Sequence, residues 1–456
     1  MKSVIALKKG LDIHLAGKAP LEIQAIGLVD VISIAPDDYI GLTPRVLVKV
    51  GEEVKSGSPI FSDKNHPEIV VVSPVSGTIE SIVRGEKRRL IRVLIKPDNK
   101  QTSVSFSSEP QLDLTREELL NRILSSGVFT YFRQRPYDVI PNPQNTPRDI
   151  FISTFDSAPL AADPSFLIQN QKEDFQAGLE VLSRLTDGKV YLSISENDHS
   201  KLFSEVKHVE KVCFKGPHPV GNVGVQMNHI KPINKGETVW TMKAAHVPLL
   251  GQLFRSGKVD FSSLIAVCGP GIRRPGYMKV LPGSSIQSIL NGLVYKEMHA
   301  RFIDGNPLTG KEVESNGFIG YFETSVTVLK EGDDIHEFFG WIMPRMDKFS
   351  MSRTYLSAII GKLFPSIRYE PDTRLLGGRR ALIVSGEYDQ VFPMDILPEQ
   401  LIRACITKNI EKQEQLGIYE VAPEDFALCE YVCTSKLELQ KIVRLALDEL
   451  RLENAD

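Results

Sequence analysis

Apolar and polar positions alternate in short runs along the first hundred residues, and glycines interrupt the runs. From Arg45 the sequence reads R-V-L-V-K-V-G-E-E-V-K-S-G-S-P-I-F, and from Val70 it reads V-V-V-S-P-V-S-G-T-I-E-S-I-V-R-G. Alternation with this period is typical of half-buried strands, and the glycines and prolines between the runs mark tight turns. Two similar half-units in succession predict a small sandwich of short strands over residues 1–100.

The next part of the chain, 101–258, alternates helical and strand-like text. Thr115 and Glu118 have the capping-box spacing, so a helix is predicted to begin near residue 116, and Gly127 can end it. A helical run near 172–186 is surrounded by strand-like runs, which cover 149–155, 189–195 and 209–214. This alternation predicts an α/β unit with a partly parallel sheet.

The pattern changes again after residue 259. Residues 262–330 read as strand, glycine turn, strand, turn and a short helix from about Ser285, which predicts a third unit over 259–335. The remainder, 336–456, is a connector followed by helical text. It ends in K-L-E-L-Q-K-I-V-R-L-A-L-D-E-L-R-L-E, which is rich in helix-forming residues.

Composition narrows the class of protein. A chain of 456 residues suggests three or four domains. Lys plus Arg is 54 and Asp plus Glu is 57, so the formal charge is −3 and the basic excess of a nucleic-acid binder is missing. No stretch approaches the roughly 18 apolar residues of a spanning helix, so any membrane role is expected to be peripheral. Five thinly spread cysteines fit a reducing compartment better than a disulfide framework.

The N-terminal pattern resembles the biotinyl/lipoyl barrel-sandwich domain. Carriers of that class attach their cofactor to a lysine between the two halves, where this chain has S-D-K-N-H-P-E-I. Lys64 is the only candidate, and it lacks the usual flanking residues and falls about three positions early. We therefore expect an unmodified structural sandwich.

Residues 262–292 resemble the soluble-ligand-binding β-grasp (SLBB) module. The residues that fall on its pattern are Gly269, Arg274, Pro275, Gly276 and Gly283. Pro275 fixes φ and Gly276 permits a positive φ, so this pair is predicted to form a tight turn between two strands.

The most unusual local sequence is F-K-G-P-H-P-V-G-N-V-G-V-Q-M-N-H at 214–229. Gly216, Gly221 and Gly224 follow a predicted strand, where glycine lets backbone amides approach a phosphate. The sequence is neither Gly-x-Gly-x-x-Gly nor a P-loop, and its two prolines remove two amide donors. A degenerate nucleotide loop and a rigid structural turn both remain open, and the turn is favoured.

Two further patterns have structural interpretations. Cys429 and Cys433 are four residues apart, and two thiols cannot complete an iron–sulfur cluster, so we expect buried structural cysteines. The basic run R-G-E-K-R-R-L-I-R at 84–92 is expected to be a solvated turn, with docking to an acidic partner or anionic headgroups as the alternative. No motif predicts a metal site or a catalytic residue.

Seven co-linear segments together resemble the A-subunit family of the sodium-translocating NADH:quinone oxidoreductases (Nqr). They are K-K-G-L-D-I near the start, V-G-E-E-V-K-S-G, S-P-V-S-G-T-I at 73–79, F-D-S-A-P-L-A-A-D-P at 155–164, G-P-H-P-V-G-N-V-G at 216–224, F-G-W-I-M-P-R-M-D-K-F-S-M-S-R-T at 339–354 and E-D-F-A-L-C-E-Y-V-C in the tail. The order of domains is also similar to the C-subunit of the Rnf complex and to the flavoprotein subunit of complex I. The resemblance implies an N-terminal barrel-sandwich hybrid, a Rossmann-like α/β domain, an SLBB β-grasp domain and a C-terminal helical domain.

The resemblance also implies a function. Nqr complexes have six subunits, pass electrons from NADH to ubiquinone or menaquinone, and export sodium. The A-subunit lies on the cytoplasmic face of the bacterial inner membrane, docked on the membrane-embedded B-subunit, and the FAD, FMN, riboflavin and iron–sulfur centres belong to other subunits. We therefore expect a peripheral subunit without a cofactor or metal of its own. The alternative is a flavin- or nucleotide-binding electron carrier like the Rnf C-subunit.

Family members have been linked to quinone binding, so a quinone site is the remaining candidate. A quinone headgroup needs an apolar slot with one or two polar groups aimed at its carbonyl oxygens. Aromatic rings and guanidinium donors occur together at 129–135, and a histidine lies in the glycine-rich loop at 214–229. The candidate residues are Phe129, Tyr131, Phe132, Arg133, Arg135 and His218.

Overall fold

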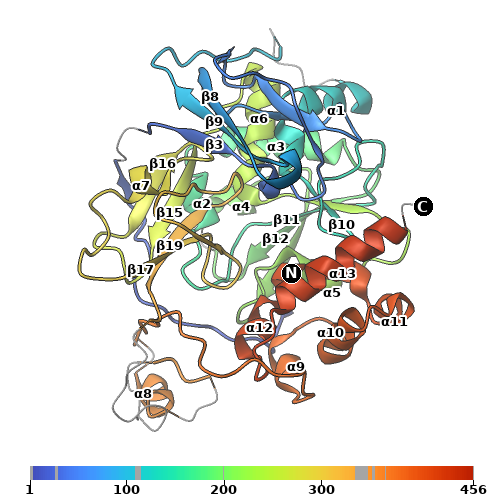
Figure 1. The fold of residues 1–456 in the computed structure, drawn as a ribbon. Helices are drawn as coiled ribbons and strands as arrows, with labels where there is room; N and C mark the ends of the chain where they lie inside the picture. Colours follow the sequence, from blue (N-terminus) through green and yellow to red (C-terminus); the bar gives the residue numbers. More distant parts are fainter. Residues whose placement is uncertain are drawn as a thin grey trace.

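The computed structural model of the chain describes residues 4–25, 29–107, 114–198, 200–333, 348–351, 355–364 and 366–454. Most of the segment at 339–354 therefore lies outside the described residues. Figure 1 shows the chain coloured from blue at its N-terminus to red at its C-terminus. The elements form four groups, which we name the N-terminal sandwich, the α/β part, the third sheet and the C-terminal helices.

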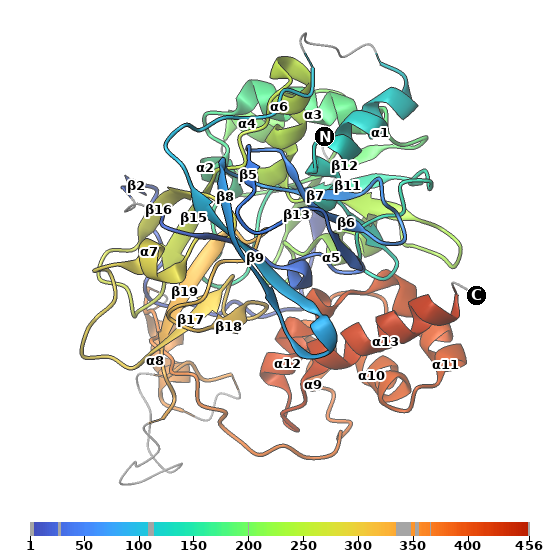
Figure 2. The ribbon, with the colours of Figure 1, turned by 45° about the horizontal axis from the view of Figure 1, so that its top comes forward.

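The N-terminal sandwich consists of two small antiparallel sheets, with strand orders β3-β9-β8-β5 and β4-β6-β7. The strands are β3 (Ile32–Ile34), β4 (Pro44–Val46), β5 (Glu53–Val54), β6 (Pro59–Asp63), β7 (Val70–Val72), β8 (Gly77–Arg84) and β9 (Leu90–Pro97). Ile32, Ile60 and Val93 are fully buried between them. The predicted sandwich of short strands is confirmed. In Figure 2 the β8–β9 hairpin, with the basic run at its turn, crosses the front of the molecule.

The α/β part is built on a six-stranded sheet with the order β1-β13-β12-β11-β14-β10. The strands are β1 (Val4–Ala6), β10 (Arg133–Arg135), β11 (Ile150–Ser153), β12 (Val190–Ser195), β13 (Glu210–Lys215) and β14 (Val239–Thr241). All neighbours pair in parallel except β10, which runs antiparallel to β14 at the edge. The predicted α/β unit with a partly parallel sheet is confirmed.

Helices accompany this sheet, and the first one begins where its cap predicts. They are α1 (Arg116–Ser125), α2 (Pro164–Leu167), α3 (Lys172–Ser183), α4 (Lys201–Ser204), α5 (Val223–Ile230) and α6 (Val247–Ser256). Thr115 and Glu118 form the predicted capping box: the Thr115 hydroxyl accepts from the Glu118 amide at 3.3 Å, and the Glu118 carboxylate accepts from the Thr115 amide at 2.8 Å.

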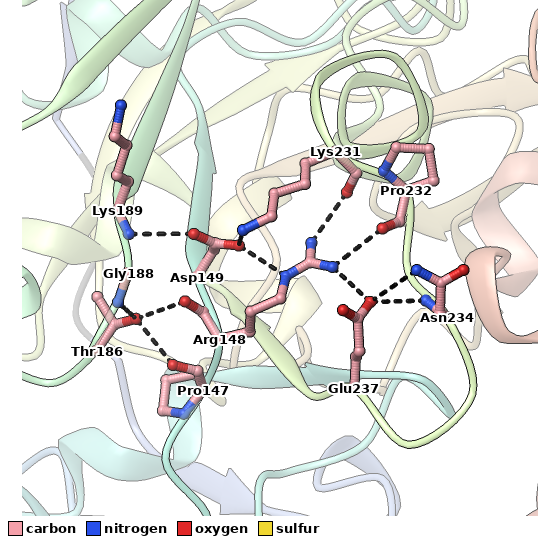
Figure 3. A network of polar contacts seen from close by, with 10 residues as sticks. All are labelled: Pro147, Arg148, Asp149, Thr186, Gly188, Lys189, Lys231, Pro232, Asn234 and Glu237. Carbon is pink, nitrogen blue, oxygen red and sulfur yellow. Dashed lines mark hydrogen bonds and ion pairs between the residues drawn. The ribbon is translucent and has the colours of Figure 1, made fainter.

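A polar network fixes the strands at their amino ends (Figure 3). The buried carboxylate of Asp149, just before β11, accepts hydrogen bonds from the amide of Lys189 at 3.1 Å and from the side chains of Arg148 and Lys231, each at 2.7 Å. Arg148 also forms an ion pair with Glu237, just before β14. Because these ends are closed by ion pairs, the opposite, carboxyl ends of the strands are the ones available for a site.

The third sheet has the order β18-β17-β19-β15-β16-β2. Its strands and its helix are β2 (Ile23–Gln24), β15 (Ser263–Cys268), β16 (Gly276–Val280), β17 (Ala300–Asp304), β18 (Lys311–Val313), β19 (Ser325–Lys330) and α7 (Ile286–Leu290). The predicted order of strand, strand and helix is confirmed, and Ser285 is the N-cap residue of α7.

The tight turn predicted at Pro275-Gly276 is wrong in its position. Gly276 is the first residue of β16, pairs with Val267 across the ladder, and does not adopt a positive φ. The left-handed conformation occurs instead at Gly269 (φ 107°) and Gly283 (φ 77°). A Cβ at Gly283 would lie 2.0 Å from the carbonyl oxygen of Ser33, so glycine there allows the third sheet to approach the N-terminal sandwich.

The C-terminal helices are α9 (Glu387–Val391), α10 (Pro398–Ile406), α11 (Ile410–Gln415), α12 (Ala427–Val432) and α13 (Leu439–Glu453). The short helix α8 (Ser357–Leu363) lies apart from them in both ribbon views. Helix α13 confirms the predicted terminal helix and buries Val443, Leu447 and Leu450 against the rest of the group. None of the helices in the described ranges is both long and apolar enough to cross a membrane.

Candidate functional site

A cavity of about 350 Å³ opens where the four groups meet. Asp38 of the N-terminal sandwich, Ser153 and Thr241 at the carboxyl ends of β11 and β14, Asp304 at the end of β17, and Glu424 before α12 all line it. The edge of a parallel sheet at which the strands end is the usual position of a ligand site, and this volume suits a small molecule.

The structure brings four of the six quinone candidates to this cavity and keeps two away from it. Tyr131, Arg133, Arg135 and His218 line the cavity. Phe129 and Phe132 are fully buried, with their rings 5.7 Å and 5.4 Å from the ring of Trp240, so they support the wall from behind.

The side chains of Asp12 and Ser157 hold His218 in place. Its amide donates to the carboxylate of Asp12 at 2.9 Å, and its Nδ1 lies 3.0 Å from the hydroxyl of Ser157. That hydroxyl oxygen also accepts the amide hydrogen of Gly221 at 2.8 Å, and Nδ1 is the only acceptor that the Ser157 O–H has among the described residues, so we assign this O–H as the donor to Nδ1. This assigns the ring hydrogen to Nε2. Burial lowers the pKa of His218 to about 4, so the ring is uncharged at neutral pH.

Aromatic rings form one side of the cavity around Tyr131. The rings of His246 and Phe322 lie 4.7 Å and 5.0 Å from the Tyr131 ring. The guanidinium of Arg133 lies 4.5 Å above the Phe322 ring and donates to the carbonyl of Thr130 at 2.8 Å. Arg133 is therefore held against the wall by cation–π contact and backbone bonds.

Arg135 connects the cavity to the C-terminal helices. Its side chain is 1% exposed and lies 2.9 Å from the carboxylate of Glu424, 3.4 Å from that of Asp425 and 3.6 Å from that of Asp138. Burial raises the pKa of Glu424 to about 7, and Arg135 opposes that rise. These three carboxylates carry more negative charge than the one guanidinium of Arg135 can balance, which favours uptake of a proton by the group.

A second group of carboxylates, which sequence reasoning missed, lies beside β17. Asp304 is 7% exposed, and its Oδ2 accepts from the amide of Gly320 at 2.7 Å, while a carboxylate oxygen of Asp38 accepts from the amide of Tyr321 at 3.1 Å. Burial, and then the nearby carboxylate of Glu323, raises the pKa of Asp304 to about 8. The only sequence signal was an acidic residue at the end of a strand and before a glycine.

The overall charge of the cavity lining is acidic. The acidic residues outnumber the basic ones seven to four: Asp37, Asp38, Asp138, Asp156, Asp304, Glu323 and Glu424 against Arg133, Arg135, Lys243 and Lys311. Burial raises the pKa of Asp38 to about 6 and that of Asp304 to about 8, so part of this excess is carried as protons. The cavity therefore disfavours anionic ligands.

The three glycines of the loop at 216–224 are tightly packed against other residues of the chain. A Cβ at Gly224 would lie 2.4 Å from the Asp425 carboxylate, one at Gly221 would lie 2.6 Å from the Ser157 amide nitrogen, and one at Gly216 would lie 2.7 Å from the carbonyl oxygen of Leu7. This close packing supports the rigid structural turn, because the space that glycine could give to a phosphate is already filled. Only Gly221 of the three lines the cavity.

The remaining predicted residues lie elsewhere. The SLBB-pattern residues Gly269, Arg274, Pro275, Gly276 and Gly283 do not line the cavity. Cys429 and Cys433 are fully buried, as expected, and the Tyr388 hydroxyl donates to the Cys433 sulfur at 2.9 Å. Lys64 directly follows strand β6 and is exposed.

The Asp304 proton gives a testable pH dependence. The pKa of Asp304 is about 8 in the folded chain and about 4 when unfolded, so the folded state binds the extra proton and stability falls as pH rises between these values. This one group contributes up to about 1.4 kcal/mol per pH unit in that window. Asp304→Asn should therefore lose less stability than the wild type between pH 6 and pH 8, as measured by urea unfolding. Equal losses of stability in the wild type and in Asp304→Asn would contradict the assignment. Exposed Asp187→Asn is the matched control and should behave like the wild type.

Arg135 gives a second prediction. Arg135→Met leaves the fully buried carboxylate of Asp425 without its cation, so the free energy of unfolding should fall by on the order of 3 kcal/mol at pH 8. The loss should be smaller at pH 5, where the carboxyl groups take up protons. Arg255→Met, which removes a 40%-exposed guanidinium paired with Glu173 and Asp174, is the control and should cost less than about 1 kcal/mol. Similar losses in both variants would argue against the network around Arg135.

Family models match three successive parts of the chain. The "NqrA N-terminal barrel-sandwich hybrid domain" matches residues 5–98, the "NqrA second alpha/beta domain" matches residues 114–259 and the "NQRA C-terminal domain" matches residues 264–315. Each corresponds to one of the groups of strands described above.

Similar proteins match nearly the whole chain. A Rhodopirellula baltica protein, named as the A-subunit of a "Na(+)-translocating NADH-quinone reductase", is 34% identical and covers 99% of both chains. Proteins of the same name from Serratia proteamaculans and Tolumonas auensis are 37% and 36% identical over 99% of this chain and 100% of their own. A solved chain of a NAD+-reducing [NiFe]-hydrogenase in the air-oxidized state is 11% identical over 76% of this chain and 68% of its own, with a TM-score of 0.40, which supports no conclusion.

Proposed function

Because the chain belongs to the A-subunit family of the Na(+)-translocating NADH-quinone reductases, we propose that it is the A-subunit of such a complex. The complex couples NADH oxidation and quinone reduction to sodium export. The observation that carries this proposal is the similarity at 34–37% identity over nearly the full length of both chains. The proposal includes peripheral attachment at the cytoplasmic face of the membrane, mainly to the B-subunit, and contact with the other five subunits.

The domain assignment belongs to the same proposal. We assign 1–100 to a barrel-sandwich hybrid, 101–258 to a Rossmann-like domain, 259–335 to an SLBB β-grasp domain and 336–456 to a connector and helical domain. The strand order of the two six-stranded sheets supports the middle two assignments. The N-terminal segment also reaches beyond its own domain, because β1 pairs with β13 and β2 pairs with β16.

Within the complex, the chain acts as a scaffold with accessory quinone binding in the cavity. A quinone headgroup is uncharged, planar and rich in acceptors, and the cavity offers aromatic rings around Tyr131 together with an acidic lining that suits an uncharged ligand. Catalytic quinone reduction is assigned to the membrane subunits, because the isoprenoid tail of a quinone stays in the lipid. Ubiquinone and menaquinone share the chemistry that this cavity recognises.

The alternative function is a flavin- or nucleotide-binding electron carrier. It requires room for a phosphate near the 216–224 loop, where Asp425 and Ser157 already lie against the glycines. Under our proposal, the purified isolated chain shows no flavin absorption and does not reduce a dye with NADH. Stoichiometric bound flavin in the isolated chain would establish the alternative.

The assembly itself is tested by affinity purification. The full chain with a terminal tag, expressed in place of the native gene and solubilised from membranes in detergent, should co-purify with five other subunits and with sodium-stimulated NADH:quinone reductase activity. A tagged chain that is recovered alone, while the same membranes keep that activity, would contradict membership of the complex. Cross-linking of the purified assembly then identifies the surface that contacts the B-subunit.

A further inference from the structure

Three buried polar atoms on residues of this cavity have no hydrogen-bond partner within the part of the chain that the structure describes. Nε of Arg135 lies 3.6 Å from the Asp138 carboxylate as an ion pair, whereas Nε2 of His218 and Oδ1 of Asp304, on residues that are 3% and 7% exposed, have no such partner. Leaving a buried polar atom unpaired costs free energy, so most such atoms in proteins have a partner. Both residues line the same cavity, one from the α/β part and one from the third sheet.

The hydrogen-bonding role of His218 follows from its other nitrogen. Because Ser157 donates to Nδ1, Nε2 carries the ring hydrogen and is a donor. The charged residue next to His218 is Asp12. Its carboxylate accepts a hydrogen bond from the backbone amide of His218 and not from the ring. Since the ring remains uncharged above about pH 4, this donor is present throughout the neutral range.

The role of Asp304 follows from its charged neighbours. Asp38 and Glu323 face it with like charge from two other segments, Lys311 on β18 opposes them, and the Gly320 amide binds its second oxygen. Arg133 also faces Asp38 and Glu323, and two cations cannot neutralise three carboxyl groups, so one carboxyl group keeps a proton. Its pKa of about 8 makes Asp304 that group near neutral pH, and its free oxygen is then a donor as well.

We propose that this cavity binds an uncharged ligand bearing two acceptor oxygens, one held by His218 Nε2–H and the other by the protonated carboxyl group of Asp304. The inference rests on the proposed accessory quinone binding and adds to it a second anchoring residue and a required protonation state. The Tyr131 and Phe322 rings supply the aromatic wall for such a ligand. An anionic ligand is disfavoured at the same two donors, because the surrounding lining is acidic.

Loss of the Asp304 proton turns its hydrogen-bond donor into an acceptor and so weakens ligand binding. An ionised carboxylate only accepts hydrogen bonds, so it repels the acceptor oxygen that the protonated form holds. At pH 9, one unit above its pKa, about one molecule in ten keeps the proton. Binding is therefore expected to weaken about tenfold between pH 6 and pH 9, with the release of the ligand coupled to the release of one proton.

The test uses the full chain and tetramethyl-1,4-benzoquinone, which is uncharged, has two carbonyl oxygens and lacks ring hydrogens that cysteine could replace. Titration calorimetry at pH 6 and pH 9 should show the tenfold weakening for the wild type. Asp304→Asn keeps a donor at every pH and should bind equally at both. Asp304→Leu and His218→Phe each remove one donor and should bind about 3–10-fold more weakly at pH 6.

The exposed ion pair between His299 and Asp333, beside the third sheet, supplies matched controls. Asp333→Asn and His299→Phe each change one member of this pair and should bind the quinone like the wild type. Circular dichroism confirms that each variant is folded. Wild-type binding that is equal at the two pH values, or unchanged in Asp304→Leu and His218→Phe, would overturn the assignment while leaving quinone binding intact. No binding by the wild type at either pH would overturn both the inference and the accessory quinone site. Membership of the complex is judged separately, by co-purification.

Discussion

The burial of Arg135 is the constraint on which the arrangement around the cavity depends. A guanidinium that is 1% exposed loses its hydration, and only carboxylates placed around it can compensate for that loss. Two of them, Glu424 and Asp425, are nearly 300 residues away in the sequence. The ion pairs therefore fix the C-terminal helices against strand β10, and the same contact places Glu424 in the cavity wall and the Asp425 carboxylate against Gly224.

The carboxylates on the two sides of the cavity are neutralised in different ways. Beside β10 the carboxylates share the guanidinium of Arg135, whereas beside β17 three carboxyl groups face Lys311 and Arg133, and a proton makes up the difference. The cavity consequently has an acidic lining that is partly uncharged at neutral pH. Such a lining suits the uncharged headgroup of a quinone and does not suit a nucleotide phosphate.

Local sequence patterns predicted the elements, because those patterns act over a few residues. The Thr115–Glu118 capping box marked the start of α1, and alternation marked the strands of the sandwich and of the α/β part. The position of the turn before β16 was wrong because glycine permits a positive φ without requiring one, and the ladder with β15 holds Gly276 extended.

The site was only partly predictable. Tyr131, Arg133, Arg135 and His218 were identified from residue type, but Phe129 and Phe132 belong to the core behind them, and periodicity could not separate the two sets. Asp304 was missed because its role depends on Asp38 and Glu323, which tertiary packing brings together from separate segments. The pairing of Arg135 with Glu424 is likewise a property of the folded chain, since no local pattern connects residues so far apart.

The protonation state of Asp304 is the central claim about this cavity, and it can be measured directly. Protein labelled with carbon-13 at the aspartate carboxyl carbons, with Asp304→Asn used to assign the signal, gives the pKa of Asp304 from its chemical shift as a function of pH. The account predicts a carboxyl group that titrates near pH 8, far above the usual aspartate range. A carboxyl group that titrates near pH 4 would show that Asp304 is ionised in the cavity and would contradict the account.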